Sequence, residues 1–196
     1  MSVMCGSKDR YFTSVNHNDD AEDPAGSPAP ELGWDDFAPL YDQHHERLYR
    51  LALLLCRGRS HAAEDAVAET FISVYKAWAN GGVDDFGAYS RRALVNHITG
   101  RARREQVASR YLAKQSTGDA VAEGGQDRIA DNTATFELLG QLPPRQRAAI
   151  VLRFYEDLSY EQIAAELNVS IGTVKAQVST GLQRLRSLLG EQEGDG

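Results

Sequence analysis

Apolar residues recur at every third or fourth position through two stretches of this chain, about residues 34–112 and 133–189, and neither stretch alternates apolar with polar residues. This spacing matches the 3.6-residue period of an α-helix, whereas a half-buried strand repeats every second residue. The sequence therefore predicts an all-α protein built from two small helical domains. Because each helix carries a broad apolar stripe, the helices of each domain must pack against one another.

The first stretch predicts three helices. The first helix stops at Gly58, the second takes Ser60 as its N-cap and ends at a Gly-Gly pair, and the third covers about residues 87–107. The inward positions of these helices are Phe37, Leu40, Tyr41, His44, Leu48, Leu51, Ala52, Leu55, Ala63, Val67, Phe71, Val74, Trp78, Leu94, Val95, Ile98 and Ala102.

The second stretch predicts four helices, of which the last two form a helix-turn-helix. Ser159 and Gln162 have the spacing of a capping box at the start of the third helix. Asn168 ends that helix, because asparagine tolerates the left-handed conformation. Ser170 then caps a final helix that reaches Leu189. The apolar set expected to lock these two helices is Ile163, Ala164, Leu167, Val169, Ile171, Val174 and Val178.

Three segments outside these stretches are polar and show no sustained period. Residues 1–33 are rich in Asn, Asp, Ser, Gly and Pro and are expected to be a disordered leader. Residues 113–132 are expected to be a flexible linker, and residues 190–196 an acidic tail. The domains are thus assigned to residues 34–112 and 133–189.

The net charge of −7 argues against a protein that binds nucleic acid unaided, because neutralisation of phosphate dominates that affinity. The charge is unevenly distributed, however. Residues 86–104 hold five arginines and no acid, and residues 170–189 hold three basic residues and no acid. Two basic islands in an acidic chain predict two separate DNA contacts that are made with the help of another molecule.

Several classes of function lack support in the sequence. No apolar run approaches the roughly 20 residues that span a bilayer, so no membrane association is expected. Cys5 and Cys56 lie in unlike settings, which fits a reducing cytoplasm without a structural disulfide. His44, His45 and His61 have no metal-ligand spacing, and no phosphate-binding or nucleophile motif occurs. We therefore expect no metal, no cofactor and no enzymatic activity.

The outer face of the final helix is suited to a DNA groove. Its residues are small or form hydrogen bonds, and none is acidic, so the backbone can approach the bases without repulsion from phosphate. An ordinary helix pair with a solvated face is the alternative at this point. The residues of the face are Gly172, Thr173, Ala176, Gln177 and Thr180.

Three segments of the second stretch resemble the fourth domain of bacterial sigma factors of the extracytoplasmic-function (ECF, group 4) type. They are LPPRQR (142–147), LSYEQIA (158–164) and SIGTVK (170–175). In that family the domain reads the minus-thirty-five promoter element. Many members carry a basic residue within 176–181, where this chain has AQVSTG, so the bases that it reads stay open. The resemblance implies DNA contacts by Ser170, Thr173, Lys175, Ala176, Gln177, Thr180 and Arg184.

The segment AEDAVAETF (63–71) is similar to the stretch of the second sigma domain that docks on the polymerase clamp. Asp65 and Glu69 lie one helical turn apart and next to Ile72, which makes an acidic and apolar patch for a partner helix. A solvated carboxylate face is the alternative. The resemblance implies polymerase contacts by Asp65, Glu69, Phe71 and Ile72.

The segment YSRRALVN (89–96) is similar to the sigma region that melts and reads the minus-ten element. Positions 92, 96, 99 and 103 form one polar or basic stripe on the predicted helix, and such a surface can hold a displaced strand. The resemblance also implies that the loop 82–86 captures a flipped base, with a plain connection as the alternative. The implied DNA contacts are Arg91, Arg92, Asn96, Thr99 and Arg103.

Together these similarities imply a cytoplasmic sigma factor that directs core RNA polymerase to promoters. The implied partners are the clamp of the largest polymerase subunit, the flap of the second largest, promoter DNA and an anti-sigma factor. Two other classes are weighed against it. A helix-turn-helix regulator that acts without core polymerase would need a receiver or ligand domain, and residues 34–112 lack its strand-helix pattern. A phosphoryl or metal enzyme would need a motif that the chain does not contain.

Overall fold

The structure is a computed structural model that describes residues 33–113 and 133–193 of the 196-residue chain. The described residues all belong to one unit of mutual contacts, residues 31–196. Every regular element among them is an α-helix, which confirms the predicted all-α class. Most of the predicted leader and linker, and the last three residues of the predicted tail, lie outside the described residues.

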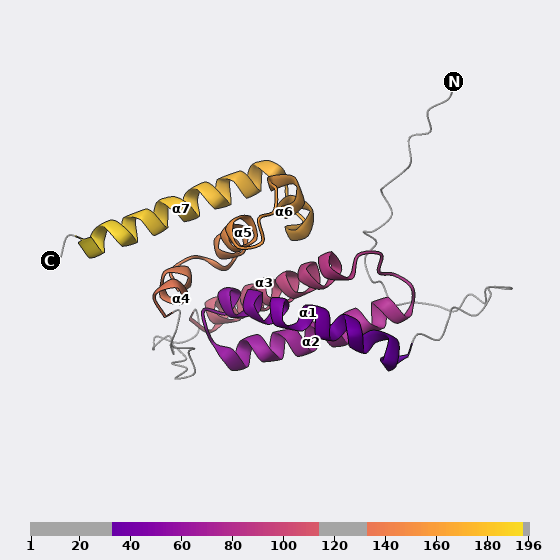
Figure 1. Cartoon of the computed structure of the whole chain (residues 1–196). Helices are drawn as coiled ribbons and strands as arrows, with labels where there is room; N and C mark the ends of the chain where they lie inside the picture. The colour runs from indigo at the N-terminus through magenta and orange to yellow at the C-terminus, as the bar shows by residue number, and fades with distance from the viewer. Residues whose placement is uncertain (1–32, 114–132, 194–196) are drawn as a thin grey trace, which may run out of the picture. The chain divides into compact units, whose positions relative to one another are not determined.

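Three helices form an N-terminal group: α1 (Trp34–Leu55), α2 (Ser60–Ala79) and α3 (Phe86–Ala113). Each of the three contacts the other two (Figure 1). Their core is strongly aromatic, because the ring of Phe37 packs edge-on against Phe71, Tyr75 and Phe86 at centroid distances of 5.0 to 6.3 Å. Most of the predicted inward positions are buried, and Leu94 and Val95 are fully so.

The chain reverses between α1 and α2 through two residues in the left-handed conformation, Arg57 (φ 63°) and Gly58 (φ 74°). The Gly58 N–H donates to the Leu53 carbonyl at 2.8 Å and so closes the end of α1, as the predicted stop requires. The predicted N-cap at Ser60 is wrong by one residue. Arg59 already has the extended backbone that a cap requires (φ −77°, ψ 102°), which places Ser60 inside the helix.

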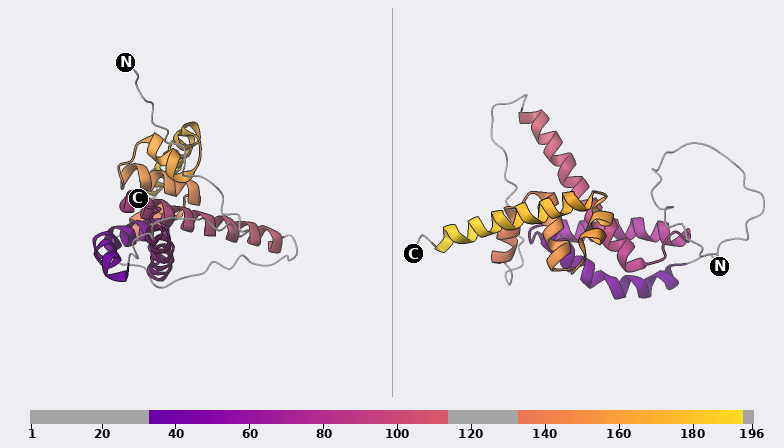
Figure 2. Two further views of the ribbon diagram at one scale, coloured as in Figure 1. Left: turned by 90° about the vertical axis from the view of Figure 1, so that its right-hand side faces the viewer. Right: turned by 90° about the horizontal axis from the view of Figure 1, so that it is seen from above.

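Four helices form a C-terminal group: α4 (Thr133–Gly140), α5 (Pro144–Phe154), α6 (Tyr160–Leu167) and α7 (Ile171–Glu193). Figure 2 shows α7 as one long helix beside α5 and α6. The predicted capping box is present, with Ser159 Oγ accepting from the Gln162 N–H and Gln162 Oε1 accepting from the Ser159 N–H. Asn168 ends α6 in the left-handed conformation (φ 50°), also as predicted.

The C-terminal group is held by side chains that are almost completely buried, among them Leu142, Leu152, Ile163 and Val174. α7 approaches α5 closely at Gly181, where an added Cβ would lie 2.6 Å from Ile150 Cδ1. One residue of the predicted locking set is not part of this core. Ile171 is 39% exposed because it is the first residue of α7, where the helix leaves the turn.

The N-terminal and C-terminal groups also contact each other, chiefly through α1 and α3 on one side and α5 and α6 on the other. Within residues 33–113 and 133–193, none of the helices combines the length and the apolar character that a membrane span requires.

Candidate nucleic-acid and polymerase interfaces

The turn between α6 and α7 is fixed by short polar contacts. The Val169 N–H donates to the Ala164 carbonyl at 3.0 Å, across the left-handed Asn168. Ser170 Oγ accepts from the Thr173 N–H at 3.1 Å and lies 2.8 Å from Thr173 Oγ1. Ser170 therefore caps α7 as predicted, and both hydroxyls are already engaged with each other.

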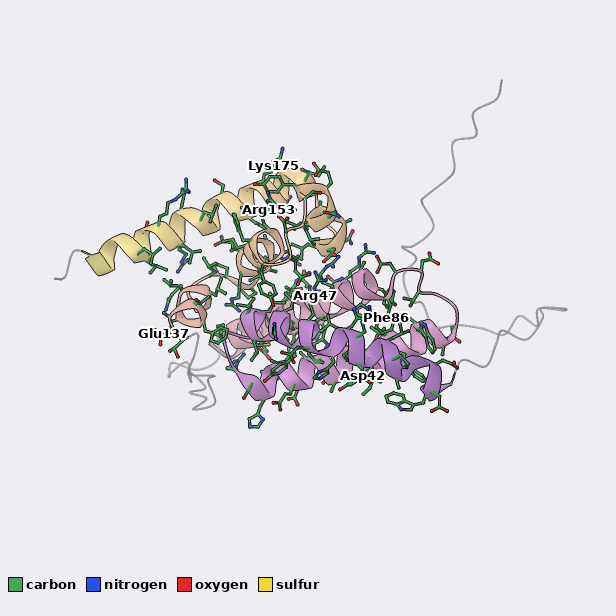
Figure 3. The ribbon with its side chains drawn as sticks, in the orientation of Figure 1. Asp42, Arg47, Phe86, Glu137, Arg153 and Lys175 are labelled. Atoms are coloured by element: carbon green, nitrogen blue, oxygen red, sulfur yellow. The ribbon has the colours of Figure 1, made fainter. Side chains whose placement is uncertain are left out.

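The outward face of α7 is basic and uncrowded. Lys175, Ala176, Thr180 and Arg184 are all exposed. Lys175 extends outward from the helix (Figure 3), and its Nζ lies 5.8 Å from the centre of the Tyr160 ring. A helix with this face can enter a major groove, since phosphate meets only cations and small side chains.

Residues 92, 96, 99 and 103, here called the α3 stripe, are only partly accessible to solvent. Asn96 and Arg103 are exposed, whereas Arg92 is half-buried. Thr99 Oγ1 donates to the Val95 carbonyl at 2.7 Å, so its proton is used within the helix. Asn96 and Arg103 are therefore the members of the stripe that present unhindered groups to solvent.

Arg91 belongs to a charge cluster that the sequence analysis missed, here called the Arg–Glu cluster: Arg47, Arg91, Glu156 and Glu166. Arg91 Nε donates to Glu166 Oε1 at 2.7 Å, and Arg91 Nη1 lies 3.7 Å from Glu156 Oε2. Arg47 Nη2 lies 2.7 Å from Glu156 Oε2. Both arginines come from the N-terminal group and both glutamates from the C-terminal group, so the cluster joins the two.

The α3 stripe and the start of α7 line a single pocket of about 180 Å³. Asn96, Thr99 and Arg103 contribute from α3, and Gln177 and Arg145 from the C-terminal group. Gln177 is half-buried, and its Oε1 has no partner among the described residues. The sequence predicted two separate DNA surfaces, and the structure places parts of both around one pocket.

The predicted polymerase face lies on α2. Asp65, Glu69 and Ile72 are exposed, and Ile72 is 59% exposed although it is a large apolar residue. Phe71 is 5% exposed and its ring packs against Phe37, so it supports the helix from the core rather than offering surface. Glu69 Oε2 also lies 3.5 Å from His97 Nε2 on α3.

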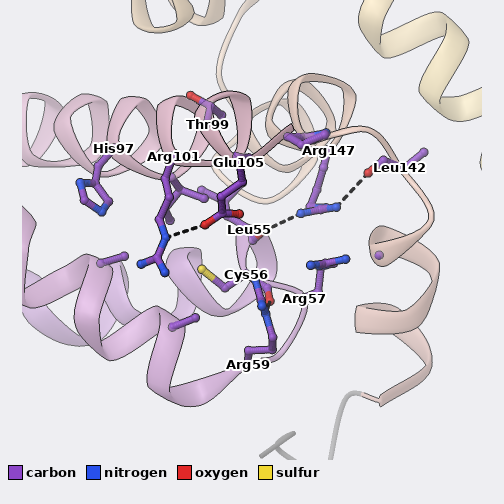
Figure 4. Close-up of a pocket in the computed structure, with 16 residues that line it drawn as sticks. Leu55, Cys56, Arg57, Arg59, His97, Thr99, Arg101, Glu105, Leu142 and Arg147 are labelled. Carbon is purple, nitrogen blue, oxygen red and sulfur yellow. Dashed lines mark hydrogen bonds and ion pairs between the residues drawn. The ribbon is translucent and has the colours of Figure 1, made fainter. Parts of the chain in front are cut away.

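A second, more basic pocket lies where α1 ends, and Arg147 is its most deeply buried cation (Figure 4). Its guanidinium donates to three carbonyls, those of Leu55, Leu139 and Leu142, at 2.7 to 2.8 Å. Burial, reinforced by the charge of Arg57, lowers the pKa of Arg147 to about 10. Arg147 therefore ties the end of α1 to the turn between α4 and α5 through backbone acceptors.

The metal-ligating residue types do not gather in the described part of the chain. No group of three or more His, Cys, Asp or Glu side chains there could hold a metal ion. Cys56 is a buried free thiol, and burial raises its pKa. The His44 ring packs 5.2 Å from Phe86, as an inward position should.

The sequence contains a signal for Glu166, one of the residues of the Arg–Glu cluster that were not predicted. Glu166 lies three residues after Ile163, on the apolar side of α6, where it is 3% exposed. A carboxylate at such a position indicates a buried partner of opposite charge. Glu156 lies between α5 and α6, outside any periodic pattern, so nothing in the sequence indicated its burial.

Two family descriptions match the chain, one in each helix group. Residues 40–120 match the family described as Sigma-70 region 2, and residues 134–185 match Sigma-70, region 4. The chain is 34% identical over 178 residues to the ECF RNA polymerase sigma factor SigE of Mycolicibacterium smegmatis, covering 88% of this chain and 68% of that protein. It is 34% identical over 139 residues to the RNA polymerase sigma-E factor of Streptomyces avermitilis, covering 68% of this chain and 74% of that protein.

A solved structure is similar as well. The sigma factor RpoE of Bartonella quintana, in complex with the anti-sigma factor NepR, superposes with a TM-score of 0.58 at 26% identity, covering 80% of this chain and 98% of that one. This chain belongs to the sigma-70 family of RNA polymerase sigma factors and, within that family, to the ECF group. It is a transcription initiation factor that binds core RNA polymerase and directs it to promoters.

Proposed function

We propose that the chain divides this work between its two helix groups, with residues 34–112 acting as sigma domain two and residues 133–189 as sigma domain four. The acid-free outer face of α7, mounted on a capped helix-turn-helix, is the observation that carries the proposal. Domain four then reads the minus-thirty-five element through α7. Domain two melts and reads the minus-ten element through α3.

The polymerase contact is assigned to the outer face of α2. Asp65 and Glu69 stand one turn apart on that face, and exposed Ile72 adds an apolar centre. An apolar centre with charged neighbours is the usual composition of a protein interface. The partner surface is the clamp of the largest subunit, and domain four meets the flap of the second largest.

The minus-ten contact is assigned to the basic side of α3 and to the loop before it. Asp85 Oδ1 accepts from the Ala88 N–H at 2.9 Å, so Asp85 caps the start of α3. Gly82 and Asp84 are exposed beside it, where a flipped base can be held. Strand separation then needs binding energy alone, so the chain itself is not an enzyme and requires no cofactor.

The acidic net charge of −7 fits a factor that works only within the holoenzyme. The free chain binds DNA weakly because its own charge repels phosphate, and core polymerase supplies the missing positive surface. The chain therefore acts in the cytoplasm, where core polymerase works. Because RpoE of B. quintana was solved with an anti-sigma factor, we include such a factor among this chain's partners.

The α2 assignment is tested by binding of core polymerase to a chain that carries Asp65→Arg and Glu69→Arg. The matched control carries Asp42→Arg and Glu46→Arg, an exposed acidic pair with the same spacing on α1. We expect the α2 variant to lose core affinity about tenfold or more, which is at least about 1.4 kcal/mol, and the control to bind as the wild type does. Circular dichroism checks that both remain helical. Equal binding by both variants would contradict the α2 assignment.

A further inference from the structure

The pocket at the end of α1 gathers positive charge that the proposed function does not use. It has a volume of about 440 Å³, and four arginines line it against one carboxylate, that of Glu105. Figure 4 shows the arginines on different sides of Cys56. We call this site the arginine pocket. Its arginines come from the turn between α1 and α2, from α3 and from α5, and are Arg57, Arg59, Arg101 and Arg147.

The charges of the arginine pocket are poorly compensated. Arg147 has no carboxylate partner in the described part of the chain, because its guanidinium donates only to carbonyls. Burial lowers the pKa of Arg147 to about 10, and the positive charges of Arg57 and Arg59 contribute to this shift. The arginines are therefore close enough to repel one another. An anion between them would supply the charge that the lining lacks.

Two of the arginines keep donors for such an anion. Arg59 Nε donates to the Cys56 carbonyl at 3.3 Å, and Arg101 Nε donates to Glu105 Oε1 at 2.9 Å. A guanidinium bound through Nε still presents the edge formed by Nη1 and Nη2, which matches two oxygens of a phosphate. The side chain of Arg101 is 53% exposed and Arg59 is half-buried, so both can adjust to a ligand.

The lining between the arginines is largely apolar. Ala62 and Ala66 contribute from α2, and Ile98 and Ala102 from α3. Sites for small molecules combine such a lining with a few charged groups and measure about 300–1,000 Å³, so the arginine pocket falls within the usual range. This composition favours an anion that carries an apolar ring over a bare phosphate.

We propose that the arginine pocket binds a nucleoside diphosphate, with the phosphates on the arginines and the base on the apolar lining. With His97 neutral, four arginines and one glutamate leave a net charge of +3 on the lining, and a diphosphate group brings a similar amount of negative charge. A free nucleotide fits better than duplex DNA, because its base is unpaired and can lie on the alanines. None of the four arginines is among the assigned DNA contacts, so the proposal does not depend on them.

Binding is tested by isothermal titration calorimetry of the full chain with ADP, in a magnesium-free buffer of fixed ionic strength. The test variant carries Arg59→Ala with Arg101→Ala. The control carries Arg50→Ala with Arg186→Ala, two exposed arginines outside the pocket, and Arg50 has an ion pair at the same spacing as that of Arg101. We expect one ADP per chain for the wild type and the control, and an affinity at least about tenfold lower for the test variant.

Circular dichroism checks that both variants remain helical. The net charge of −7 disfavours general attraction of ADP to the surface, so binding that survives in the control reports on the pocket. Equal affinity of the two variants, or no binding by the wild type, overturns the site.

The apolar half of the site is tested with inorganic pyrophosphate and with Ala62→Leu. Ala62 is half-buried, so leucine keeps every charge while it narrows the lining. The wild type should bind ADP more tightly than pyrophosphate, and Ala62→Leu should reduce this difference. Equal affinity of the wild type for the two probes overturns the contact with the base. Displacement of ADP by a short DNA duplex at the same phosphate concentration overturns the nucleotide in favour of nucleic acid.

Discussion

Each of the three nitrogens of the Arg147 guanidinium donates a hydrogen bond to the backbone. Nε, Nη1 and Nη2 each donate to a different carbonyl: Leu139 near the end of α4, Leu55 at the end of α1, and Leu142 in the turn between α4 and α5. None of these acceptors carries a full charge, and the lowered pKa means that the fold tolerates the cation rather than attracting it. Its contribution to stability therefore comes from satisfied backbone carbonyls, two of which would otherwise be buried at helix ends.

We expect Arg147→Lys to lower the free energy of unfolding by about 2–3 kcal/mol. A lysine ammonium is a compact charge that cannot span three fixed acceptors, and each lost hydrogen bond to a buried carbonyl costs about 1 kcal/mol. Urea unfolding followed by circular dichroism measures the change. Arg145→Lys, at an exposed position of the same helix, is the control. A loss no larger than that of the control would show that Arg147 does not secure the turn.

Lys175 and Gln177 should separate positioning on DNA from reading of its sequence. Lys175 is an exposed cation suited to phosphate, so Lys175→Ala should weaken all promoters alike and reduce the salt dependence by about one counterion. Gln177 can pair bidentately with adenine, a contact worth about 1–3 kcal/mol of discrimination. Gln177→Ala should therefore change preference among variants of the upstream element. Competition binding by holoenzyme on a randomised element measures both, and a wild-type profile for Gln177→Ala would remove it from the reading set.

At the scale of elements, the sequence predicted helix ends correctly where one residue type adopts one characteristic backbone geometry. The left-handed end at Asn168 and the capping box at Ser159 both followed from local hydrogen bonding. The ends of α3 and α7 were placed too early, at about 107 and 189 instead of Ala113 and Glu193. In α7, Gly190 and three polar residues continue the helix past Leu189, so the apolar pattern ends before the helix does.

Two features of the structure exclude a side chain at Gly58, in the turn between α1 and α2. Its φ of +74° disfavours any side chain, and an added Cβ would lie 2.5 Å from Cδ2 of the Phe136 ring on α4. We expect Gly58→Ala to lower the free energy of unfolding by about 1–2 kcal/mol from the backbone alone, and by more if Phe136 is displaced. Gly190→Ala is the control, because nothing lies within 4 Å of its added Cβ. Thermal unfolding of both variants measures the loss of stability, and equal melting temperatures would contradict the expected strain at Gly58.

At the scale of the whole molecule, the all-α class and the two helix groups could be predicted. The apolar period and the resemblance to sigma domains are both read from residues that are close together in the sequence. The contact between the groups could not be predicted. Arg91 and Glu166 are 75 residues apart, and no local pattern pairs a given arginine with a given glutamate across that separation. For the same reason Arg91 was predicted as a DNA contact without its buried partner, and Phe71 as a polymerase contact despite its place in the aromatic core.

Run-off transcription on genomic fragments, with purified core polymerase and the added chain, tests promoter direction most directly. We expect discrete transcripts that require both components and start at a fixed distance from a shared pair of upstream sequences. Core polymerase alone and the chain alone should give none of them. Specific DNA binding by the chain alone, with no new start site when core polymerase is added, would contradict the assignment and indicate a regulator that acts without core polymerase.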